Sequence, residues 1–333
     1  MDGYLELSRD DRRLLCEDAR ATLGLTAESI EKDFWVCWTL RELFTLAEWG
    51  PRLTFKGGTS LSMGWKLIER FSEDIDVVID REFLGLGAER LSNKQIRRLK
   101  EECSRRIADD LLPALRKRLQ ERLPDNESWK LEAADAQVDP DLQTLLFEYP
   151  KEFDYGGTYV KPVVKIELGA RGEAEPTEMP EIQPLLAEAY PTVLGDARFS
   201  VRTLAPRRTF WEKAMLLHEE TYRPPGKPRK ARMSRHYYDL WCLINKGVAA
   251  EASLDHGLFE RVAAHRKEFF RYGWMDYTTL SKGRIRLVPL AEQEAEWRAD
   301  YSAMSGEMFF GDPPAFDEVL RIVKHFEVEF NEG

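Results

Sequence analysis

The fold of this chain is decided by two neighbouring stretches, Phe55-Lys56-Gly57-Gly58-Thr59-Ser60-Leu61-Ser62 and Arg70-Phe71-Ser72-Glu73-Asp74-Ile75-Asp76-Val77-Val78-Ile79. The apolar residues before the glycines predict a short strand, and the Gly-Gly pair predicts a tight turn. We expect a helix from Thr59 to about Ile68. Because the run from Ile75 to Ile79 is apolar and β-branched, it predicts a buried strand.

Two carboxylates, Asp74 and Asp76, lie at the start of that second strand. Side chains alternate along a strand, so both project to the same face. Like charges at this range repel each other unless a cation lies between them, so we expect the pair to bind Mg²⁺. Glu167, on another apolar strand, is our candidate for a third metal ligand and catalytic carboxylate. The alternative is an edge-strand glutamate paired with Lys165 or Arg171.

The segment Gly57-Gly58-Thr59-Ser60 has the features of a phosphate-binding turn. Glycines let the backbone approach a phosphate closely, and N–H groups at the start of a helix favour an anion. Lys56 and Arg70 flank the turn and the carboxylate pair. Either cation offsets phosphate charge, or Arg70 pairs with an aspartate and orients it. The segment is not a Walker A loop, because no Ser or Thr follows Lys66.

The rest of the chain predicts an α+β fold, with a small mixed sheet flanked by helices and a helical C-terminal half. Ser8 and Thr26 are expected to cap two N-terminal helices, the second ending at Gly50-Pro51. A long amphipathic helix is expected over residues 94–122. The other expected elements are strands over Leu142–Tyr149 and Tyr159–Leu168, and helices over Arg207–Thr221, Ser234–Asn245, Phe259–Phe270 and Phe316–Phe330. We predict a core domain over residues 1–200 and a helical domain over 201–333 that closes the nucleotide site.

The bulk composition narrows the classes of function. A net charge of −10 argues against a wholly basic nucleic-acid coat, although local patches still contact phosphates. The chain begins without a signal-peptide pattern and has no apolar run of about 18 residues, so we expect a cytoplasmic protein without a membrane span. The four cysteines are scattered, which favours buried thiols over a zinc site or a disulfide framework.

A basic segment over residues 223–235 carries six Lys or Arg residues and no acidic one. Its prolines exclude a helix there. Two interpretations remain open for this segment. It is either a solvated excursion, or a surface on which Arg229, Lys230 and Arg232 bind the RNA backbone.

These motifs resemble the abortive-infection nucleotidyltransferase toxins of the AbiEii type, within the DNA polymerase β-like superfamily. The resemblance extends to Ile30–Val36, Phe210–Lys213 and Arg235–Leu240. It implies that Asp74 and Asp76 bind metal, that Gly58, Thr59 and Ser60 grip phosphate, and that Lys213 holds the triphosphate. Asp239 is then the acidic residue of the last motif, near the nucleotide or a base. The interval between Ser60 and Asp74 is slightly longer than the family pattern, which puts the shape of the nucleotide pocket in question.

The resemblance also implies a reaction and a set of partners. Toxins of this type are encoded beside an antitoxin and act in phage defence, and those best understood as enzymes add nucleotides from NTP to the 3′ end of tRNA. We therefore expect NMP transfer from NTP to an RNA 3′ end, with Mg²⁺ as cofactor and an antitoxin protein as partner. Two alternatives remain: transfer to a hydroxyl of a protein or small molecule, and nucleotide binding without turnover.

Overall fold

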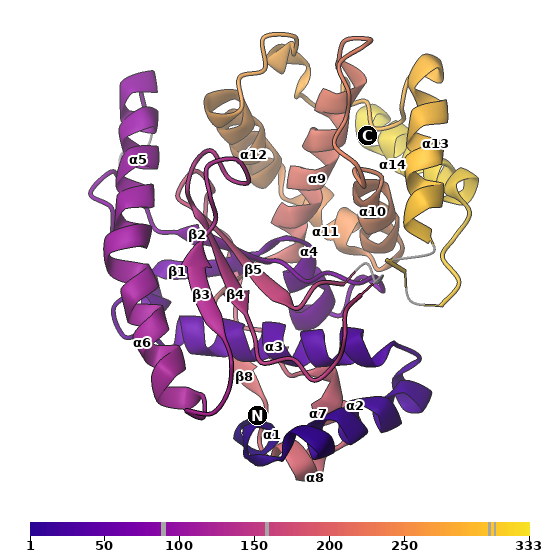
Figure 1. Cartoon of the computed structure of the whole chain (residues 1–333). Helices are drawn as coiled ribbons and strands as arrows, with labels where there is room; N and C mark the ends of the chain where they lie inside the picture. Colours follow the sequence, from indigo (N-terminus) through magenta and orange to yellow (C-terminus); the bar gives the residue numbers. More distant parts are fainter. Residues whose placement is uncertain (88–90, 157–159, 306–307, 310) are drawn as a thin grey trace. The chain divides into compact units, whose positions relative to one another are not determined.

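A computed structural model describes residues 1–87, 91–156, 160–305, 308–309 and 311–333 of the chain (Figure 1). The chain forms two compact units. The first contains Met1–Gly64 and Ser72–Leu204, and the second contains Trp65–Phe71 and Ala205–Gly333. The short segment Trp65–Phe71, which we assigned by sequence to the first domain, therefore groups with the second unit.

The first unit is built on a mixed sheet, which confirms the predicted α+β class. Within the described residues the sheet has seven strands in the order β3-β4-β5-β2-β1-β9-β6. β2 lies between β1, to which it is antiparallel, and β5, to which it is parallel. The strands span β1 Leu53–Lys56, β2 Ile75–Ile79, β3 Lys130–Ala133, β4 Thr144–Glu148, β5 Val163–Gly169, β6 Thr177–Glu178 and β9 Thr203–Leu204. The predicted start of β5 at Tyr159 falls outside the described residues.

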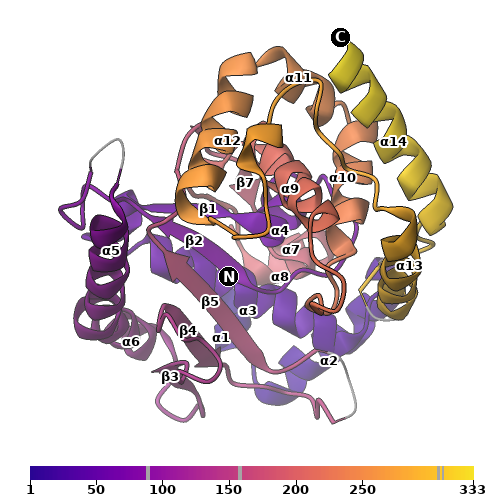
Figure 2. The ribbon, with the colours of Figure 1, turned by 90° about the horizontal axis from the view of Figure 1, so that it is seen from above.

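Helices cover this sheet. Helix α3, Ala27–Phe44, is buried along most of its length, contacts β5, and crosses the sheet in the view of Figure 2. Ser8 caps α2, Arg9–Leu23, and Thr26 caps α3, as the sequence predicts. The long helix runs as α5, Asn93–Arg106, a π-helical turn over Ile107–Leu111, and α6, Leu112–Arg122. Short elements complete the unit: α1 Asp2–Glu6, α7 Leu185–Ala189, α8 Pro191–Leu194, β7 Glu181–Ile182 and β8 Phe199–Ser200.

The helix predicted from Thr59 to about Ile68 is wrong in its bounds. It begins earlier, as α4 Gly57–Thr59, and ends after a π-helical turn over Ser60–Gly64. The glycine pair therefore forms the first turn of the helix, and it is not a separate tight turn between the strand and the helix. Lys66 has a φ of +53°, a left-handed conformation that an L-residue rarely adopts and that a helix cannot continue through. The end predicted for α3 at Gly50-Pro51 is also late, because the helix stops at Phe44.

The second unit is helical and has its own aromatic core. Trp211 packs against Phe259 and Phe330, with ring centroids 4.9 and 4.8 Å apart. The predicted helices are present, and the sequence reading missed α11 and α13. The helices are α9 Pro206–Thr221, α10 Arg235–Asn245, α11 Val248–Leu254, α12 His256–Phe269, α13 Ala291–Ser305 and α14 Phe316–Glu332.

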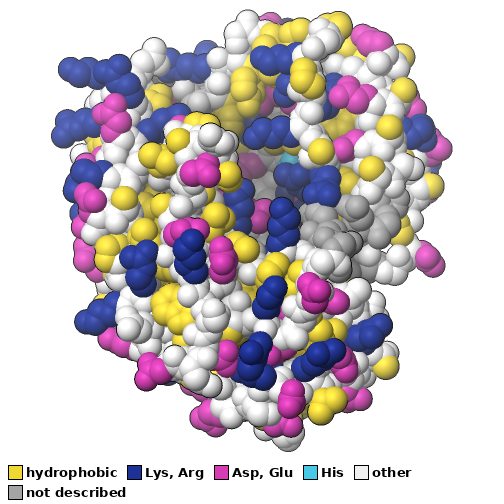
Figure 3. Space-filling model, in the orientation of Figure 1, with side chains coloured by type: hydrophobic (Ala, Val, Ile, Leu, Met, Phe, Trp, Pro, Cys, Tyr) yellow, Lys and Arg dark blue, Asp and Glu magenta, His cyan; other side chains and the backbone are white. Residues whose placement is uncertain are grey.

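Two properties of the chain's surface bear on its function. In the part of the chain that the structure describes, none of the helices has the length and apolar character needed to cross a membrane. Lys and Arg side chains are interspersed with Asp and Glu side chains over the face shown in Figure 3. Any nucleic-acid contact must therefore come from a local arrangement of cations and not from the overall charge.

Candidate active site

The predicted carboxylates meet at the centre of the sheet. In the parallel pairing of β2 with β5, Asp76 lies directly beside Glu167, and their side chains form a hydrogen bond. Burial, and next the charge of Glu167, raise the pKa of Asp76 to about 7, although Lys56 acts in the opposite direction. Lys56 is the cross-strand partner of Asp76 on β1. Asp74 precedes β2 on the same face and adds to the negative charge around Asp76.

Gly57 sets how closely the turn approaches Asp76. A Cβ atom at Gly57 would lie 2.1 Å from the Oδ2 atom of Asp76, and Gly57 has a φ of +82°. A side chain at this position would require the Asp76 carboxylate or the turn to shift, and the backbone conformation would be strained. Gly57 therefore lets helix α4 begin directly against the Asp76 carboxylate.

Glu167 lies on an internal strand, so the alternative of an edge strand is wrong. Strand β5 is flanked by β4 and β2. The ion pair considered in that alternative is nevertheless present, because the Lys165 ammonium group contacts the Glu167 carboxylate. Arg171 pairs with Asp141. Glu167 thus faces Asp76 on one side and is neutralised by Lys165.

The hydroxyl groups of the phosphate-binding turn point into the protein. Thr59 and Ser60 are fully buried. Thr59 donates a hydrogen bond to the backbone carbonyl of Asp74 and contacts the Ser72 hydroxyl at 2.9 Å. Ser60 donates to the carbonyl of Gly57 at 2.9 Å. These contacts fix the turn relative to Asp74. They leave the backbone N–H groups that begin helix α4 as the groups for an anion, because no side chain caps that helix.

The motif Glu31-Lys32-Asp33 on α3 contacts several distant segments of the first unit. Lys32 pairs with Glu73 at 2.7 Å, next to Asp74, and donates to the carbonyl of Lys161 at 2.8 Å. Each of the two acids accepts a backbone N–H from a distant segment. The motif therefore positions the segment that carries Asp74.

The donor set fits a divalent cation in its chemistry. Asp76 and Glu167 are adjacent hard-oxygen donors, Asp74 lies on the same face, and burial followed by the charge of Glu167 raises the pKa of Asp76. No group of three or more His, Cys, Asp or Glu side chains in the described residues is arranged to hold a metal ion. Oxygen donors of the type that divalent cations prefer are therefore present, but the described residues do not assemble a full set of metal ligands.

A second cluster lies within the helical unit. Arg70 donates two hydrogen bonds to Asp239, at 2.7 and 2.8 Å, and Lys213 pairs with the same carboxylate at 2.8 Å. All three side chains are buried. Burial acts to raise the pKa of Asp239, but the two cations overcome it and hold the pKa well below its ordinary value. Arg70 thus pairs with Asp239, and not with an aspartate of the first cluster. Two cations share one carboxylate, so the trio carries one net positive charge.

His236 lies beside this trio, and the sequence analysis included it only as part of the Arg235–Leu240 motif. Burial, and next the positive charge of Lys213, lower the pKa of His236 well below its ordinary value, so the ring is neutral. Its Nδ1 atom is buried and has no hydrogen-bond partner among the described residues. The signal was present in the sequence, since His236 falls within the motif that contains Asp239.

The three cations predicted for RNA differ in their surroundings. Arg229 is largely buried, bonds to Glu220 at 3.1 Å and to Glu296, and lies over the Trp297 ring. Lys230 is exposed. Arg232 is half-buried and donates its backbone N–H to Asp300. Arg229 therefore acts within the fold, whereas Lys230 presents its charge to solvent.

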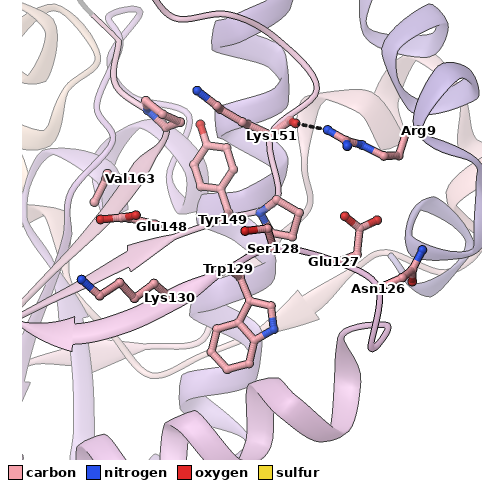
Figure 4. A pocket seen from close by; sticks show the side chains of 12 residues that line it. Arg9, Asn126, Glu127, Ser128, Trp129, Lys130, Glu148, Tyr149, Lys151 and Val163 are labelled. Carbon is pink, nitrogen blue, oxygen red and sulfur yellow. Dashed lines mark hydrogen bonds between the residues drawn. The ribbon is translucent and has the colours of Figure 1, made fainter.

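A separate pocket of about 600 Å³ opens in the first unit beside β3 and β4 (Figure 4). Arg9 crosses its rim and donates to the carbonyl of Lys151 at 2.9 Å. Trp129 and Tyr149 contribute aromatic rings to its lining. None of the predicted site residues lines this pocket.

Comparisons with known proteins place the chain in a family. A family model described as "Nucleotidyl transferase AbiEii toxin, Type IV TA system" matches residues 38–322. The comparison with curated proteins gives no match. Among solved structures, the chain is similar to MenT4, a nucleotidyltransferase toxin from Mycobacterium tuberculosis H37Rv, with 16% sequence identity and a TM-score of 0.35. That similarity covers 90% of this chain and 99% of MenT4.

Proposed function

We propose that this chain, which belongs to the AbiEii family of nucleotidyltransferase toxins of type IV toxin–antitoxin systems, transfers NMP from an NTP to the 3′-hydroxyl of an RNA. Membership of this family shows that the chain is a toxin of the nucleotidyltransferase class. The RNA acceptor, for which the tRNA 3′ end is our candidate, and the identity of the transferred group are our proposal. An antitoxin is the protein partner that the family implies.

The proposed reaction breaks one bond and forms one. The 3′-oxygen of the RNA bonds to the α-phosphorus of the NTP, and the bond from that phosphorus to the bridging oxygen of the β-phosphate breaks. Pyrophosphate leaves, and the hydroxyl proton passes to a base. Glu167 is our candidate for that base, because it adjoins Asp76 at the centre of the sheet. The Lys165 ammonium group contacts the same carboxylate, and a base must lie within hydrogen-bond reach of the proton that it accepts.

Asp74, Asp76 and Glu167 would hold Mg²⁺. When bound, the ion neutralises phosphate oxygens and aligns the attacking and leaving groups. The protein contributes the positions of these carboxylates. Gly57 brings the turn against Asp76, and the Thr59 hydroxyl ties the turn to the backbone of Asp74. Catalysis in this proposal rests on positioning and electrostatics.

The net positive trio of Arg70, Lys213 and Asp239 supports a role in binding the triphosphate. A buried net charge is unfavourable unless a counter-ion offsets it, and a triphosphate is such a counter-ion. Asp239 uses both carboxylate oxygens on the two cations. In this proposal Asp239 therefore orients Lys213 and Arg70 and does not itself contact the nucleotide.

One observation carries the proposal: Asp76 and Glu167 adjoin each other at the sheet centre, directly against the Gly57 turn. The test is to offer α-labelled and γ-labelled NTPs to the full chain with total RNA, a protein extract and small hydroxyl compounds in parallel. We expect α-label, and no γ-label, on RNA. Label on protein or on a small molecule would replace the RNA proposal with a different acceptor. If the chain binds NTP and transfers no label to any acceptor, the proposal is replaced by that of a nucleotide-binding protein without turnover.

A further inference from the structure

An exposed tyrosine and a half-buried tryptophan stack in the loop that follows α12. The rings of Tyr272 and Trp274 are parallel, with centroids 4.8 Å apart and an angle of 5° between their planes. Tyr272 is 37% exposed, and Phe270 beside it is 38% exposed. Trp274 is half-buried, so Tyr272 is the member of the pair whose ring is more accessible for stacking. We call Tyr272 and Trp274 the stacking platform.

Cations from a second loop surround this platform. The loop that follows α9 places the Arg223 guanidinium 5.4 Å and the Lys227 ammonium 5.7 Å from the centre of the Trp274 ring. Both loops lie within the helical unit, at the top of Figure 1. A cation over an aromatic face is attracted to the ring. The basic segment noted in the sequence and the stacked rings therefore form one surface.

Two acidic residues under this surface, Glu219 and Glu220, are paired with arginines. Glu220 is held by Arg223 with two bonds of 2.6 Å, and by Arg229. Glu219 is held by the buried Arg266. By contrast, three exposed lysines of the two loops have no carboxylate partner among the described residues: Lys227, Lys230 and Lys282. These three lysines contribute positive charge to the surface, and the exposed Glu292 lines the same pocket as Lys227.

We propose that the stacking platform binds a single-stranded segment of RNA, with one base stacked on Tyr272 and a neighbouring phosphate held by Lys227. An inference of this kind rests on the proposed function, because RNA is the acceptor class there. Single-stranded nucleic acid is recognised by aromatic faces that stack bases and by cations that follow the backbone. A duplex keeps its bases paired and stacked, so it offers no free base to Tyr272. The platform therefore selects an unpaired end or loop.

The assignment changes which residues of the basic segment contact RNA. Arg229 is committed to Glu220, Glu296 and Trp297 inside the fold. Lys227 lies over the Trp274 ring instead, six residues after α9 ends at Thr221. An acidic protein surface would also pair with these cations, but it would not require an aromatic ring on which a base can stack. RNA uses both features.

The test measures binding without chemistry. The full chain, without NTP, is titrated into a fluorescently labelled single-stranded oligoribonucleotide, and the Kd is measured by anisotropy at several salt concentrations. Tyr272→Ala is compared with Tyr272→Phe, which keeps the ring, and Lys227→Glu with Lys117→Glu, an exposed lysine on α6 of the first unit. A duplex of the same sequence is measured in parallel. Circular dichroism verifies that each variant is folded.

We expect Tyr272→Ala to weaken binding roughly 5- to 100-fold, as loss of one stacked base does, and Tyr272→Phe to bind within about twofold of the unmodified chain. Lys227→Glu should weaken binding and reduce the salt dependence by about one phosphate contact, whereas Lys117→Glu should not. The duplex should bind less tightly than the single strand. Equal Kd values for the unmodified chain and Tyr272→Ala, or equal binding of duplex and single strand, would overturn the proposal.

Two parallel measurements separate this inference from the proposed function and from a protein interface. If the unmodified chain labels RNA from α-labelled NTP but Tyr272→Ala binds RNA normally, the inference fails and the function stands. If no RNA is labelled, yet binding depends on Tyr272, the inference stands and the function fails. If Tyr272→Ala keeps its RNA affinity and instead loses binding to the antitoxin, the surface is a protein interface and the inference is wrong.

Discussion

Replacing Gly57 with alanine should separate catalysis from stability. The added Cβ would lie 2.1 Å from the Oδ2 atom of Asp76, so the carboxylate or the turn must move by about 1 Å or more to reach ordinary contact distance. A shift of that size at a catalytic group costs roughly 100-fold in rate. The left-handed backbone at Gly57 adds strain of about 1–2 kcal/mol to the folded state.

Gly24 provides a matched control for the strain alone. It caps helix α2 with a φ of +67°, and an added Cβ would have no heavy atom within 4 Å. Gly24→Ala should therefore lose about 1–2 kcal/mol of stability for the same backbone reason and keep its activity. Gly57→Ala should lose a similar amount of stability together with nearly all of its activity.

Two measurements separate the effect of Gly57→Ala on catalysis from its effect on stability. The free energy of unfolding is obtained from urea denaturation, and the initial rate of label transfer from α-labelled NTP to RNA is measured for both variants and the unmodified chain. The reasoning is refuted if Gly57→Ala retains more than about a tenth of the rate, since a displaced Asp76 should lose roughly 100-fold. It is also refuted if Gly24→Ala loses as much activity as Gly57→Ala.

Three further predictions concern the helical unit, and urea denaturation measures each of them. Asp239→Ala should cost about 3–5 kcal/mol of stability, because it leaves two buried cations without their carboxylate, whereas Lys213→Met should cost less than half of that. Arg229→Ala should cost about 2 kcal/mol through its lost charged hydrogen bonds, and Lys230→Ala should change stability by less than about 0.5 kcal/mol. As the pH falls from 6.5 through 4, the chain should lose up to roughly 3 kcal/mol of stability through His218, whose pKa is lowered to about 4 by burial.

The sign of the His218 effect follows from its hydrogen bonds. Nδ1 accepts the backbone N–H of Arg286 at 2.8 Å, so the ring proton is on Nε2, which donates to the Thr279 hydroxyl at 2.9 Å. The folded chain therefore holds the neutral ring, while the unfolded chain takes up a proton below pH 6.5. The contribution of His218 to stability is therefore fully present above its unfolded pKa of about 6.5, and it is lost as the pH falls toward its folded pKa of about 4. His218→Gln should remove this part of the pH slope, and an unchanged slope would contradict the assignment.

The sheet strand that carries the carboxylates was predictable because its signal is local. Ile75–Ile79 is observed as predicted, since a run of apolar, β-branched residues has few alternatives to a buried strand. Ser8 and Thr26 were readable as caps for the same reason. By contrast, β3 contains Lys130 and Glu132, which have little preference for strands. Pairing with β4 makes it a strand, and that pairing is not visible in the local sequence.

The family resemblance was confirmed, whereas the contacts between distant residues required the structure. The pairing of Asp76 with Glu167 depends on a parallel register between strands about 90 residues apart in the chain. Arg70 was expected to neutralise phosphate or to pair with an aspartate near the phosphate-binding turn, and the structure pairs it with Asp239, 169 residues away in the chain. A single sequence contains no signal for such a pair. The roles of these residues in nucleotide binding remain predictions.

The most direct test of the central claim compares the unmodified chain with the Asp74→Ala/Asp76→Ala double variant. Both are incubated with Mg²⁺, total tRNA and each α-labelled NTP in turn, after circular dichroism has shown that both are folded. We predict that label from at least one NTP appears on tRNA with the unmodified chain and not with the double variant. Equal labelling by the two proteins would contradict the claim that the carboxylates of the sheet centre carry out nucleotidyl transfer.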